Sequence, residues 1–298
     1  AISAFGLIVA VLASLIISSN ALVAIALLRL IQKSRCYGLC FVLNLAFSDA
    51  MVGFTVISLA IDELSPPLYP SQTFCILRMA FVTFSSAASI LSLTLVAFDR
   101  HLAIRKPFHY FQLMTGMRVG ARLVGLWLLA AIIGFLPVAA PSFQHTSAKD
   151  KCSFFGVFQP GYLFIVFCVG FFPALFIFIY LYCDMLKIAA THVQHIREVE
   201  HAGLGGRCRP TRAASDMKAM RTVAMLTGCF TLSWLPFFIA SIVQTMCPEC
   251  LPSKVIENYL WLLGLCNSFL NPLLYSYFQK DVRLQFVQLA ASVKRRVL

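Results

Sequence analysis

The stretch Ile90–Phe108, ILSLTLVAFDRHLAIRKPF, places a charge pair at the end of a long apolar run. Twenty apolar or small hydroxyl-bearing residues, 79–98, precede Asp99 and Arg100, and the apolar residues 102–104 follow His101. Ionisable groups inside a bilayer are costly and usually face a partner or water. The pair therefore predicts either a polar site within a span or the point where a span meets the membrane surface.

The composition predicts an integral membrane protein. Of the 298 residues, 60% are hydrophobic and only 12% are charged, and the mean hydropathy is +0.83. Water-soluble domains are about 25% charged. The net charge of +12 could indicate nucleic-acid binding, but that requires basic residues interleaved with a polar scaffold. Basic loops at a membrane account for the charge better, so we expect membrane lipids and no nucleic acid as partners.

Seven segments are long and apolar enough to span a bilayer, which requires about 20 mostly apolar residues. They are residues 2–30, 39–61, 73–98, 119–140, 158–186, 219–246 and 255–278. The first is too long and lacks the basic front of a cleavable leader. The sequence thus predicts an all-α, seven-transmembrane helix bundle over residues 1–278.

The tail, residues 279–298, is too polar to span. Its apolar positions recur at helical spacing (Val282, Phe286, Leu289, Val293). This pattern predicts a short amphipathic helix at the cytoplasmic membrane surface, held by Phe286 and by the basic run at residues 294–296.

The basic residues predict the orientation of the bundle. Of the 24 Lys and Arg residues, 20 lie in the first, third and fifth loops, the adjoining helix ends and the tail. The other four are Arg78, Lys149, Lys151 and Lys254. Because Lys and Arg favour the cytoplasmic side, we expect a multi-pass plasma-membrane protein with an extracellular N-terminus and a cytoplasmic C-terminus.

Asp49, in LNLAFSDAMV, lies near the middle of the second predicted span. One interpretation is a neutral, hydrogen-bonded carboxyl group that only packs. The other is a polar hub that binds Na⁺ or a proton, because hard cations prefer oxygen ligands. The candidate members of this hub, on several spans, are Asn20, Ser89, Asn267, Ser268 and Asn271.

Three prolines interrupt the fifth, sixth and seventh spans, at Pro173, Pro236 and Pro272. Each removes a backbone hydrogen bond and favours a kink. They accompany CFTLSWLPF (229–237) and NSFLNPLLYSYF (267–278). In these motifs the chain resembles the rhodopsin-like (class A) G-protein-coupled receptors.

The resemblance extends over essentially the whole chain. Asp99-Arg100-His101 resembles the family's Asp-Arg-Tyr triplet, with His in place of Tyr. Other motif positions are Asn20, Asp49, Trp127, Pro173, Trp234, Pro236, Asn271, Pro272 and Tyr275, and the connector beneath the ligand pocket would be Ile90, Pro173 and Phe230. The resemblance also implies a clasp between Arg100 and Asp216, a heterotrimeric G protein as partner, and no cofactor other than an allosteric Na⁺ at Asp49. One departure is Leu181, where the family carries a tyrosine; Tyr182 follows it.

The same resemblance implies a disulfide between Cys75, at the outer start of the third span, and Cys152 in the second outer loop. Cys247 and Cys250, in MCPECL, are either bridged or two free thiols, and the loop lacks the further ligands that a zinc site would need.

The ligand class follows in part from one position. Amine-binding members of the family carry an aspartate eighteen residues before the motif arginine, and this chain has Val82 there. The pocket would be lined by Val82, Phe154, Phe155, Trp234, Phe237, Phe238 and Trp261, which suits a hydrophobic ligand but is also what a plain helix core contains. Arg78 and Glu257 would either form an outer salt bridge or also hold a ligand head group.

Longer stretches resemble a narrower group within the family. They are LRMAFVT (77–83), GLWLLAAIIGFLP (125–137), CSFFGVF (152–158), YLYCDMLKIA (180–189) and residues 259–285. Members of that group respond to fatty-acid ethanolamides and lysophospholipids and raise cyclic AMP through the stimulatory G protein. The resemblance therefore implies a lipid receptor with that coupling, or a family member with another hydrophobic ligand.

Two other classes of protein are less compatible with the sequence. A seven-helix transporter would show repeated halves, and the chain has no internal repeat. An intramembrane hydrolase would need a catalytic set within the spans, whereas the six histidines lie in loops or at the cytoplasmic side. We expect no enzymatic activity.

Overall fold

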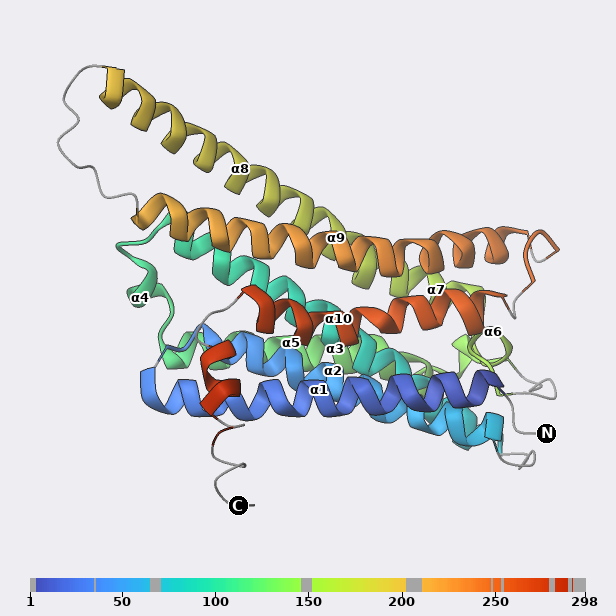
Figure 1. Cartoon of the computed structure of the whole chain (residues 1–298). Coiled ribbons are helices and arrows are strands. Elements are labelled where there is room, and N and C mark those ends of the chain that lie inside the picture. Colours follow the sequence, from blue (N-terminus) through green and yellow to red (C-terminus); the bar gives the residue numbers. More distant parts are fainter. Residues whose placement is uncertain are drawn as a thin grey trace.

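The computed structural model describes residues 4–34, 36–64, 71–145, 152–201, 211–247, 249–252, 255–278, 282–288 and 291. The described elements form a bundle of long helices (Figure 1). They are α1 (Ala4–Ser34), α2 (Leu39–Leu64), α3 (Gln72–Arg105), α4 (Tyr110–Leu113), α5 (Gly116–Ala139), η1 (Pro141–Phe143), α6 (Phe154–Val157), α7 (Pro160–Ile165), η2 (Val166–Phe171), α8 (Phe172–His201), α9 (Thr211–Met246), η3 (Val255–Leu260) and α10 (Trp261–Phe278).

The prediction of an all-α bundle with seven spans is confirmed. Within the described residues, six helical segments are long and apolar enough to cross a membrane. The seventh predicted span consists of η3 followed directly by α10. Three helices run well past the predicted boundaries, since α3 ends at Arg105, α8 ends at His201 and α9 begins at Thr211. Hydropathy changes at the membrane surface, whereas the helices continue beyond it through more polar stretches of sequence.

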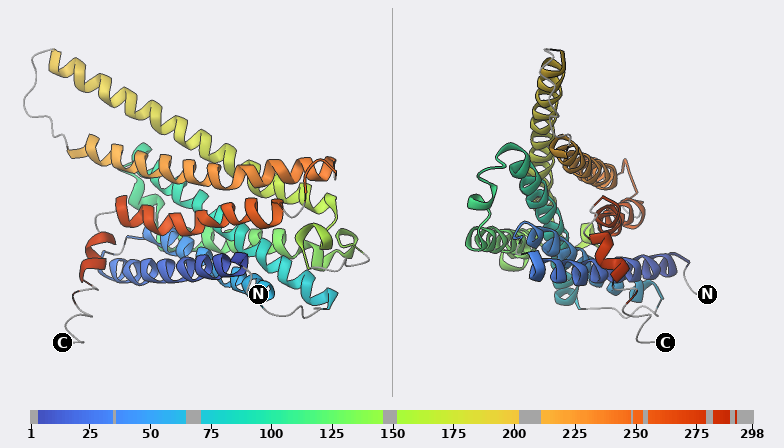
Figure 2. Two further views of the ribbon diagram at one scale, coloured as in Figure 1. Left: turned by 45° about the vertical axis from the view of Figure 1, so that its right-hand side comes forward. Right: turned by 60° about the vertical axis from the view of Figure 1, so that its left-hand side comes forward.

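Helix α3 lies at the centre of the bundle and contacts α2, α5, α8 and α9 (Figure 2). Its buried positions continue along its whole length, from Cys75 to Ile104. The outer faces of the other helices carry exposed large apolar side chains, such as Phe54 of α2, Leu128 of α5 and Phe176 of α8. A chain buried in lipid places apolar groups on both its core and its outer face, so these side chains are the surface that contacts the acyl chains.

The fifth span is not a continuous α-helix. Residues Val166–Phe171 form the π-helix η2, and the N–H of Phe172 donates to the carbonyl of Phe167, five residues earlier. Pro173 follows, which has no N–H and whose ring crowds the carbonyl four residues before it. The wider turn accommodates the proline without ending the helix. The sequence indicated a distortion near Pro173 but not its type; α9 and α10 continue through Pro236 and Pro272.

Residues 282–288 of the tail are helical, beside the end of α1 in Figure 1. Val282 is fully buried in the same cluster as Val23 and Leu27 of α1, and Phe286 packs against that cluster. Leu289 and residues 293–296, on which part of the amphipathic prediction depends, lie outside the described residues.

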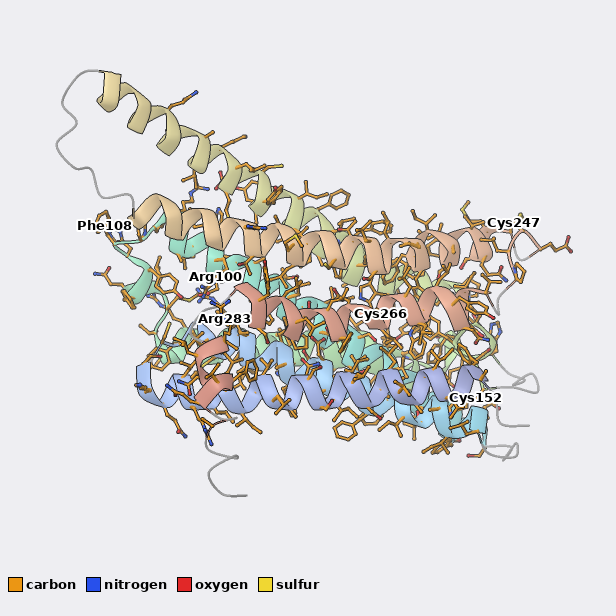
Figure 3. The ribbon with its side chains drawn as sticks, in the orientation of Figure 1. Arg100, Phe108, Cys152, Cys247, Cys266 and Arg283 are labelled. Carbon is orange, nitrogen blue, oxygen red and sulfur yellow. A yellow bond between two sulfur atoms is a disulfide. The ribbon has the colours of Figure 1, made fainter. Side chains whose placement is uncertain are left out.

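Two disulfides lie at one end of the bundle. Cys75, near the start of α3, is bonded to Cys152, just before α6, so the predicted pairing is confirmed. Cys247 and Cys250 are also bonded, which settles the alternative left open by the sequence. Figure 3 places Cys152 and Cys247 at the end of the bundle opposite Arg100, Phe108 and Arg283. The two ends of the bundle are therefore chemically distinct.

The contact between α3 and α5 requires a glycine. A Cβ atom on Gly134 would lie 2.7 Å from the backbone nitrogen of Phe84, which cannot move away as a flexible side chain could. We expect Gly134→Ala to separate the two helices and to cost about 1–3 kcal/mol of stability, as overpacking typically does. The melting temperature of the purified protein would measure this loss.

Gly125, in the same helix, provides the matched control, because nothing lies within 4 Å of its Cβ position. Gly125→Ala should leave the melting temperature unchanged or slightly raised, since alanine is the better helix former. Equal effects of the two substitutions would contradict the assigned α3–α5 contact.

Candidate functional site

The carboxylate of Asp49 is fully buried in the middle of the bundle and joins three helices. Its Oδ1 accepts hydrogen bonds from Ser89 Oγ of α3 at 2.5 Å and from Ser268 Oγ of α10 at 2.9 Å. Its Oδ2 accepts from Asn271 Nδ2, also of α10, at 2.9 Å. Three members of the predicted hub therefore bind the carboxylate directly.

The two remaining members of the hub lie in the same region without bonding Asp49. Asn20 of α1 donates from Nδ2 to the carbonyl of Ser268 at 2.9 Å, which ties α1 to α10. Asn267 is buried, and its Oδ1, like that of Asn271, has no hydrogen-bond partner among the described residues. The hub thus contains a buried carboxylate and two amide oxygens with free acceptor capacity.

A second polar layer, which sequence reasoning missed, lies one helical turn nearer the Arg100 end. Asn44 of α2 donates from Nδ2 to Ser92 Oγ of α3 at 2.7 Å. Its Oδ1 accepts from the indole N–H of Trp127 of α5 at 2.9 Å. The sequence analysis identified Trp127 as a motif residue but did not identify its partner Asn44. Asn44 could have been identified because it is a polar residue within an otherwise apolar predicted span.

The charge pair Asp99–Arg100 lies at the end of the bundle opposite the disulfides, and Arg100 binds its neighbour Asp99 there. The guanidinium donates from Nε to Asp99 Oδ2 at 2.9 Å, and its Nη2 bonds the same oxygen. The Asp99 carboxylate is almost entirely buried, and its Oδ1 accepts from the Tyr110 hydroxyl at 2.6 Å. Burial, followed by the adjacent carboxylate, raises the pKa of Tyr110, so its hydroxyl stays protonated and able to donate.

Gly38 allows this arrangement. A Cβ atom at Gly38 would overlap the Tyr110 hydroxyl and lie 2.7 Å from Asp99 Oδ1. The turn between α1 and α2 therefore approaches the Asp99–Tyr110 hydrogen bond so closely that only glycine fits. The sequence analysis identified neither Gly38 nor Tyr110.

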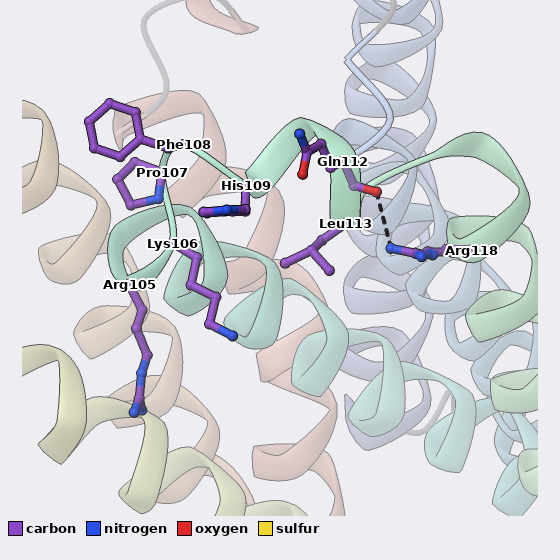
Figure 4. Close-up of a pocket in the computed structure, with 8 residues that line it drawn as sticks. All are labelled: Arg105, Lys106, Pro107, Phe108, His109, Gln112, Leu113 and Arg118. Carbon is purple, nitrogen blue, oxygen red and sulfur yellow. Dashed lines mark hydrogen bonds between the residues drawn. The ribbon is translucent and has the colours of Figure 1, made fainter.

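His101, which stands where the family has tyrosine, contacts α8. Its Nε2 lies 2.7 Å from Asp184 Oδ2. Arg105, which points towards α8 in Figure 4, donates from Nη1 to the same oxygen at 2.7 Å. A histidine is long enough and polar enough to reach this carboxylate, so two consecutive turns of α3 are joined to α8 through Asp184.

Two further switch assignments have different outcomes. The side chain of Asp216 lies outside the described residues, so its clasp with Arg100 stays a prediction. Ile90 and Phe230 of the connector are buried in the main core cluster, where the Phe230 ring lies 5.6 Å from Phe171 and 5.2 Å from Phe178. Leu181 is buried in the same cluster, Pro173 and Tyr182 are half-buried, and Tyr275 is buried in α10.

At the disulfide end, the predicted ligand-binding side chains pack as one aromatic cluster. Phe238 stacks on Phe171 with ring centroids 3.9 Å apart and lies 5.8 Å from Trp234. Trp234 in turn lies against α10 because Gly264 has no side chain to displace it. The members of the predicted lining that this core cluster includes, fully or partly buried, are Phe154, Phe155, Trp234, Phe237, Phe238 and Trp261. Val82 is buried on α3.

The Arg78–Glu257 pair stays a prediction, as does its role in holding a ligand head group. Glu257 is engaged by another part of the chain, since its Oε1 accepts from the backbone N–H of Phe155 at 3.1 Å. The Cys75–Cys152 disulfide ties the start of the same segment to α3, three residues before Phe155. The carboxylate therefore fixes the loop that carries Phe154 and Phe155.

These features define a class of protein. A family model for the seven-transmembrane receptors of the rhodopsin family matches residues 19–275, which is most of the chain. The chain belongs to this rhodopsin-like receptor family, whose members act through G proteins.

Two curated relatives narrow the comparison. The chain is 54% identical over 293 residues to the glucose-dependent insulinotropic receptor of Homo sapiens, covering 98% of this chain and 88% of that receptor. It is 52% identical over 288 residues to the receptor of that name from Rattus norvegicus, covering 96% of this chain and 62% of that receptor. A more distant relative is 5-hydroxytryptamine receptor 4 of Rattus norvegicus, at 30% identity over 294 residues, 91% of this chain and 72% of that receptor.

The hydroxyl of Tyr110 can be tested by Tyr110→Phe. Removing it leaves a buried carboxylate oxygen without one of its donors, which typically costs about 1–3 kcal/mol. We expect a lower melting temperature for the purified receptor. Tyr37→Phe is the matched control, because Tyr37 is 45% exposed. If the two variants melted alike, the Tyr110–Asp99 hydrogen bond would contribute nothing to stability.

Proposed function

We propose that this chain is a receptor for lipid-like agonists of the fatty-acid ethanolamide and lysophospholipid type, and that it raises cyclic AMP through the stimulatory G protein. In this proposal the disulfide end of the bundle is extracellular and the end carrying Arg100 is cytoplasmic. The distribution of basic residues, with 20 of 24 on the Arg100 side, supports the orientation.

The buried valine Val82 is the observation that carries the ligand class. Several relatives at about 30% identity are named as receptors for 5-hydroxytryptamine, which is a cationic amine. Amine-binding members of the family carry an aspartate at the position of Val82, so this chain lacks the carboxylate that would neutralise such a ligand. Its apolar, buried surroundings favour an uncharged or amphiphilic ligand.

The surrounding cluster supports the same class. The Phe238 ring packs against both Phe167 and Phe171, with centroid distances of 5.1 and 3.9 Å. An acyl chain that enters between them exchanges one apolar contact for another, whereas a charged group would lose its hydration without a partner. Glu257 and the Phe155 backbone, at the edge of the cluster, supply the polar groups that an amide or hydroxyl head group could bond.

The inner end supports coupling to a G protein. Arg100 binds Asp99 in a part-buried site between α3 and the second inner loop, and Tyr110 contributes the third contact of that carboxylate. A guanidinium held by an adjacent acid can be released when the neighbouring helices move. Selectivity for the stimulatory subunit depends on the resemblance to the ethanolamide and lysophospholipid receptors.

Cyclic AMP measurements in cells expressing the chain test the ligand class. We expect a rise with a fatty-acid ethanolamide and none with 5-hydroxytryptamine. Val82→Asp buries a carboxylate in the apolar cluster and should weaken the lipid response by about tenfold or more, since an unpartnered buried charge costs several kcal/mol. Val82→Ile, which keeps the apolar surface, should retain the response at equal surface expression. A response to 5-hydroxytryptamine in the unmodified receptor would overturn the assignment.

We also propose that the Asp49 hub binds Na⁺. The carboxylate bonds only neutral side chains among the described residues, and the amide oxygens of Asn267 and Asn271 have free acceptor capacity beside it. These oxygens suit a hard cation. A bound ion would neutralise the carboxylate and hold α2, α3 and α10 together, which favours the conformation without agonist.

The Na⁺ proposal predicts that NaCl lowers agonist affinity relative to an equal concentration of N-methylglucamine chloride, by about fivefold, a typical allosteric coupling. Asp49→Asn should abolish the difference because the amide carries no charge to bind the ion. Asn44→Asp, one layer away, is the comparison for a generally perturbed polar layer. Persistence of the Na⁺ effect in the Asp49 variant would exclude this site.

A further inference from the structure

The disulfide between Cys247 and Cys250 closes the turn that joins α9 to η3. Its cysteines are three residues apart, whereas those of the Cys75–Cys152 bridge are 77 residues apart. A disulfide stabilises a fold mainly by restricting the unfolded chain, so its contribution grows with the length of the loop that it closes. The short bridge therefore contributes much less to the stability of the bundle, and the protein can lose it without unfolding.

The two bridges also differ in how accessible they are to a reductant. Cys75 is buried and Cys152 is half-buried, whereas Cys250 is exposed and Cys247 is half-buried. Thiol–disulfide exchange begins when a thiolate reaches one sulfur atom of the bridge, and exposed bridges are accordingly the labile ones. A reductant therefore reaches the short bridge first, through Cys250.

The turn that this bridge closes has its own backbone hydrogen bonds. The N–H of Cys247 donates to the carbonyl of Val243 at 2.8 Å, which continues the hydrogen bonding of α9. The N–H of Cys250 donates to the carbonyl of Cys247 at 3.0 Å. The disulfide holds the same two residues together and so restricts the backbone from which η3 starts.

The contact between η3 and the loop at the aromatic cluster is polar. Glu257 of η3 accepts from the backbone N–H of Phe155 at 3.1 Å. Leu251 and Ile256 pack with the main core cluster, Ile256 being fully buried there. These apolar contacts keep η3 on the bundle when the bridge opens. A hydrogen bond depends more strictly on distance and angle, so the Glu257–Phe155 bond is the contact that weakens.

We propose that the Cys247–Cys250 disulfide is a modification site, reduced by an extracellular protein dithiol, and that its reduction loosens the loop that carries Phe155. The location of the partner outside the cell depends on the proposed orientation of the bundle. The reaction itself does not depend on the agonist or on the G protein.

The exchange has two steps. A thiolate of the partner attacks Cys250 Sγ, the bond between the two receptor sulfur atoms breaks, and Cys247 leaves as a thiolate that takes up a proton. The second thiolate of the partner then attacks the partner's own sulfur in the mixed disulfide, and Cys250 leaves and is protonated. The receptor bridge gains two electrons and two protons, both from the dithiol, which becomes a disulfide. The reverse exchange restores the bridge.

The exchange can be measured on the whole purified receptor in nanodiscs, with reduced thioredoxin as the probe dithiol. The thiols that appear are alkylated and quantified by mass spectrometry. We expect Cys247 and Cys250 to become alkylated at a thioredoxin concentration about tenfold lower than Cys75 and Cys152 require, because the exposed bridge exchanges first. Reduction of both bridges together, or of neither, would overturn the proposed site.

Hydrogen exchange of residues 153–158 measures the effect on the loop. We expect reduction to speed this exchange about fivefold, the lower end of the usual coupling between two sites. Cys247→Ser/Cys250→Ser should exchange at the faster rate from the outset and should not respond to thioredoxin. Exchange at the slow rate in this variant would show that the bridge does not hold the loop, which overturns the proposal.

Two further variants test the specificity and the route of this effect. Cys36→Ser/Cys40→Ser is the matched control, because it removes two free cysteines of the opposite end and should leave the thioredoxin response intact. Glu257→Ala should give fast exchange whether or not the bridge is closed. A thioredoxin effect of full size in the Glu257 variant would overturn the route through its hydrogen bond to Phe155.

Discussion

The buried carboxylate of Asp49 is the constraint on which the arrangement of the bundle depends. In an apolar medium, a carboxylate must find its hydrogen-bond donors within the protein, because lipid offers none. Ser89 supplies one donor from α3, and Ser268 and Asn271 supply two from α10. A shift of either helix along its axis by one residue would remove these donors. The apolar surfaces of the helices alone would allow the helices to slide past one another. The hydrogen bonds of the Asp49 carboxylate prevent this sliding.

The polar layers extend the constraint to the outer members of the bundle. Asn20 connects α1 to the backbone of α10, and Trp127 connects α5 to Asn44 of α2. Five helices are thus aligned by two small groups of side chains near the middle of the spans. Because these groups align the helices near the middle, the two ends of the bundle can be held by different kinds of interaction. One end carries the disulfides and the aromatic cluster, and the other is held by the ion pairs of Asp99 and Asp184.

The fold was predictable because its signals are local. Seven apolar runs, their prolines and the Asp-Arg-His triplet can each be read from a few consecutive residues, and the family disulfide followed from the same resemblance. The Asp49 hub was predictable for a related reason, since a polar side chain in a lipid-embedded span needs polar neighbours. The sequence did not predict contacts between side chains that are far apart in the chain. Asp184 meets His101 only because α3 and α8 cross at that level, and Glu257 bonds Phe155 although the two residues are 102 positions apart in the sequence.

The π-helix at Val166–Phe171 has a consequence for how such receptors can diverge. Its hydrogen bonds join residues five apart, whereas those of an α-helix join residues four apart, so the π-helix contains one extra residue. Each residue of an α-helix turns the chain by about 100°. Deleting a single residue there would allow a regular helix and rotate α7 against its neighbours. Tyr162, whose hydroxyl now bonds the carbonyl of Ile133, would turn away, and different side chains of α7 would face inward. The inward face of this segment is therefore encoded in the length of the chain as well as in its residues, so an insertion or deletion of one residue could change its specificity without any substitution.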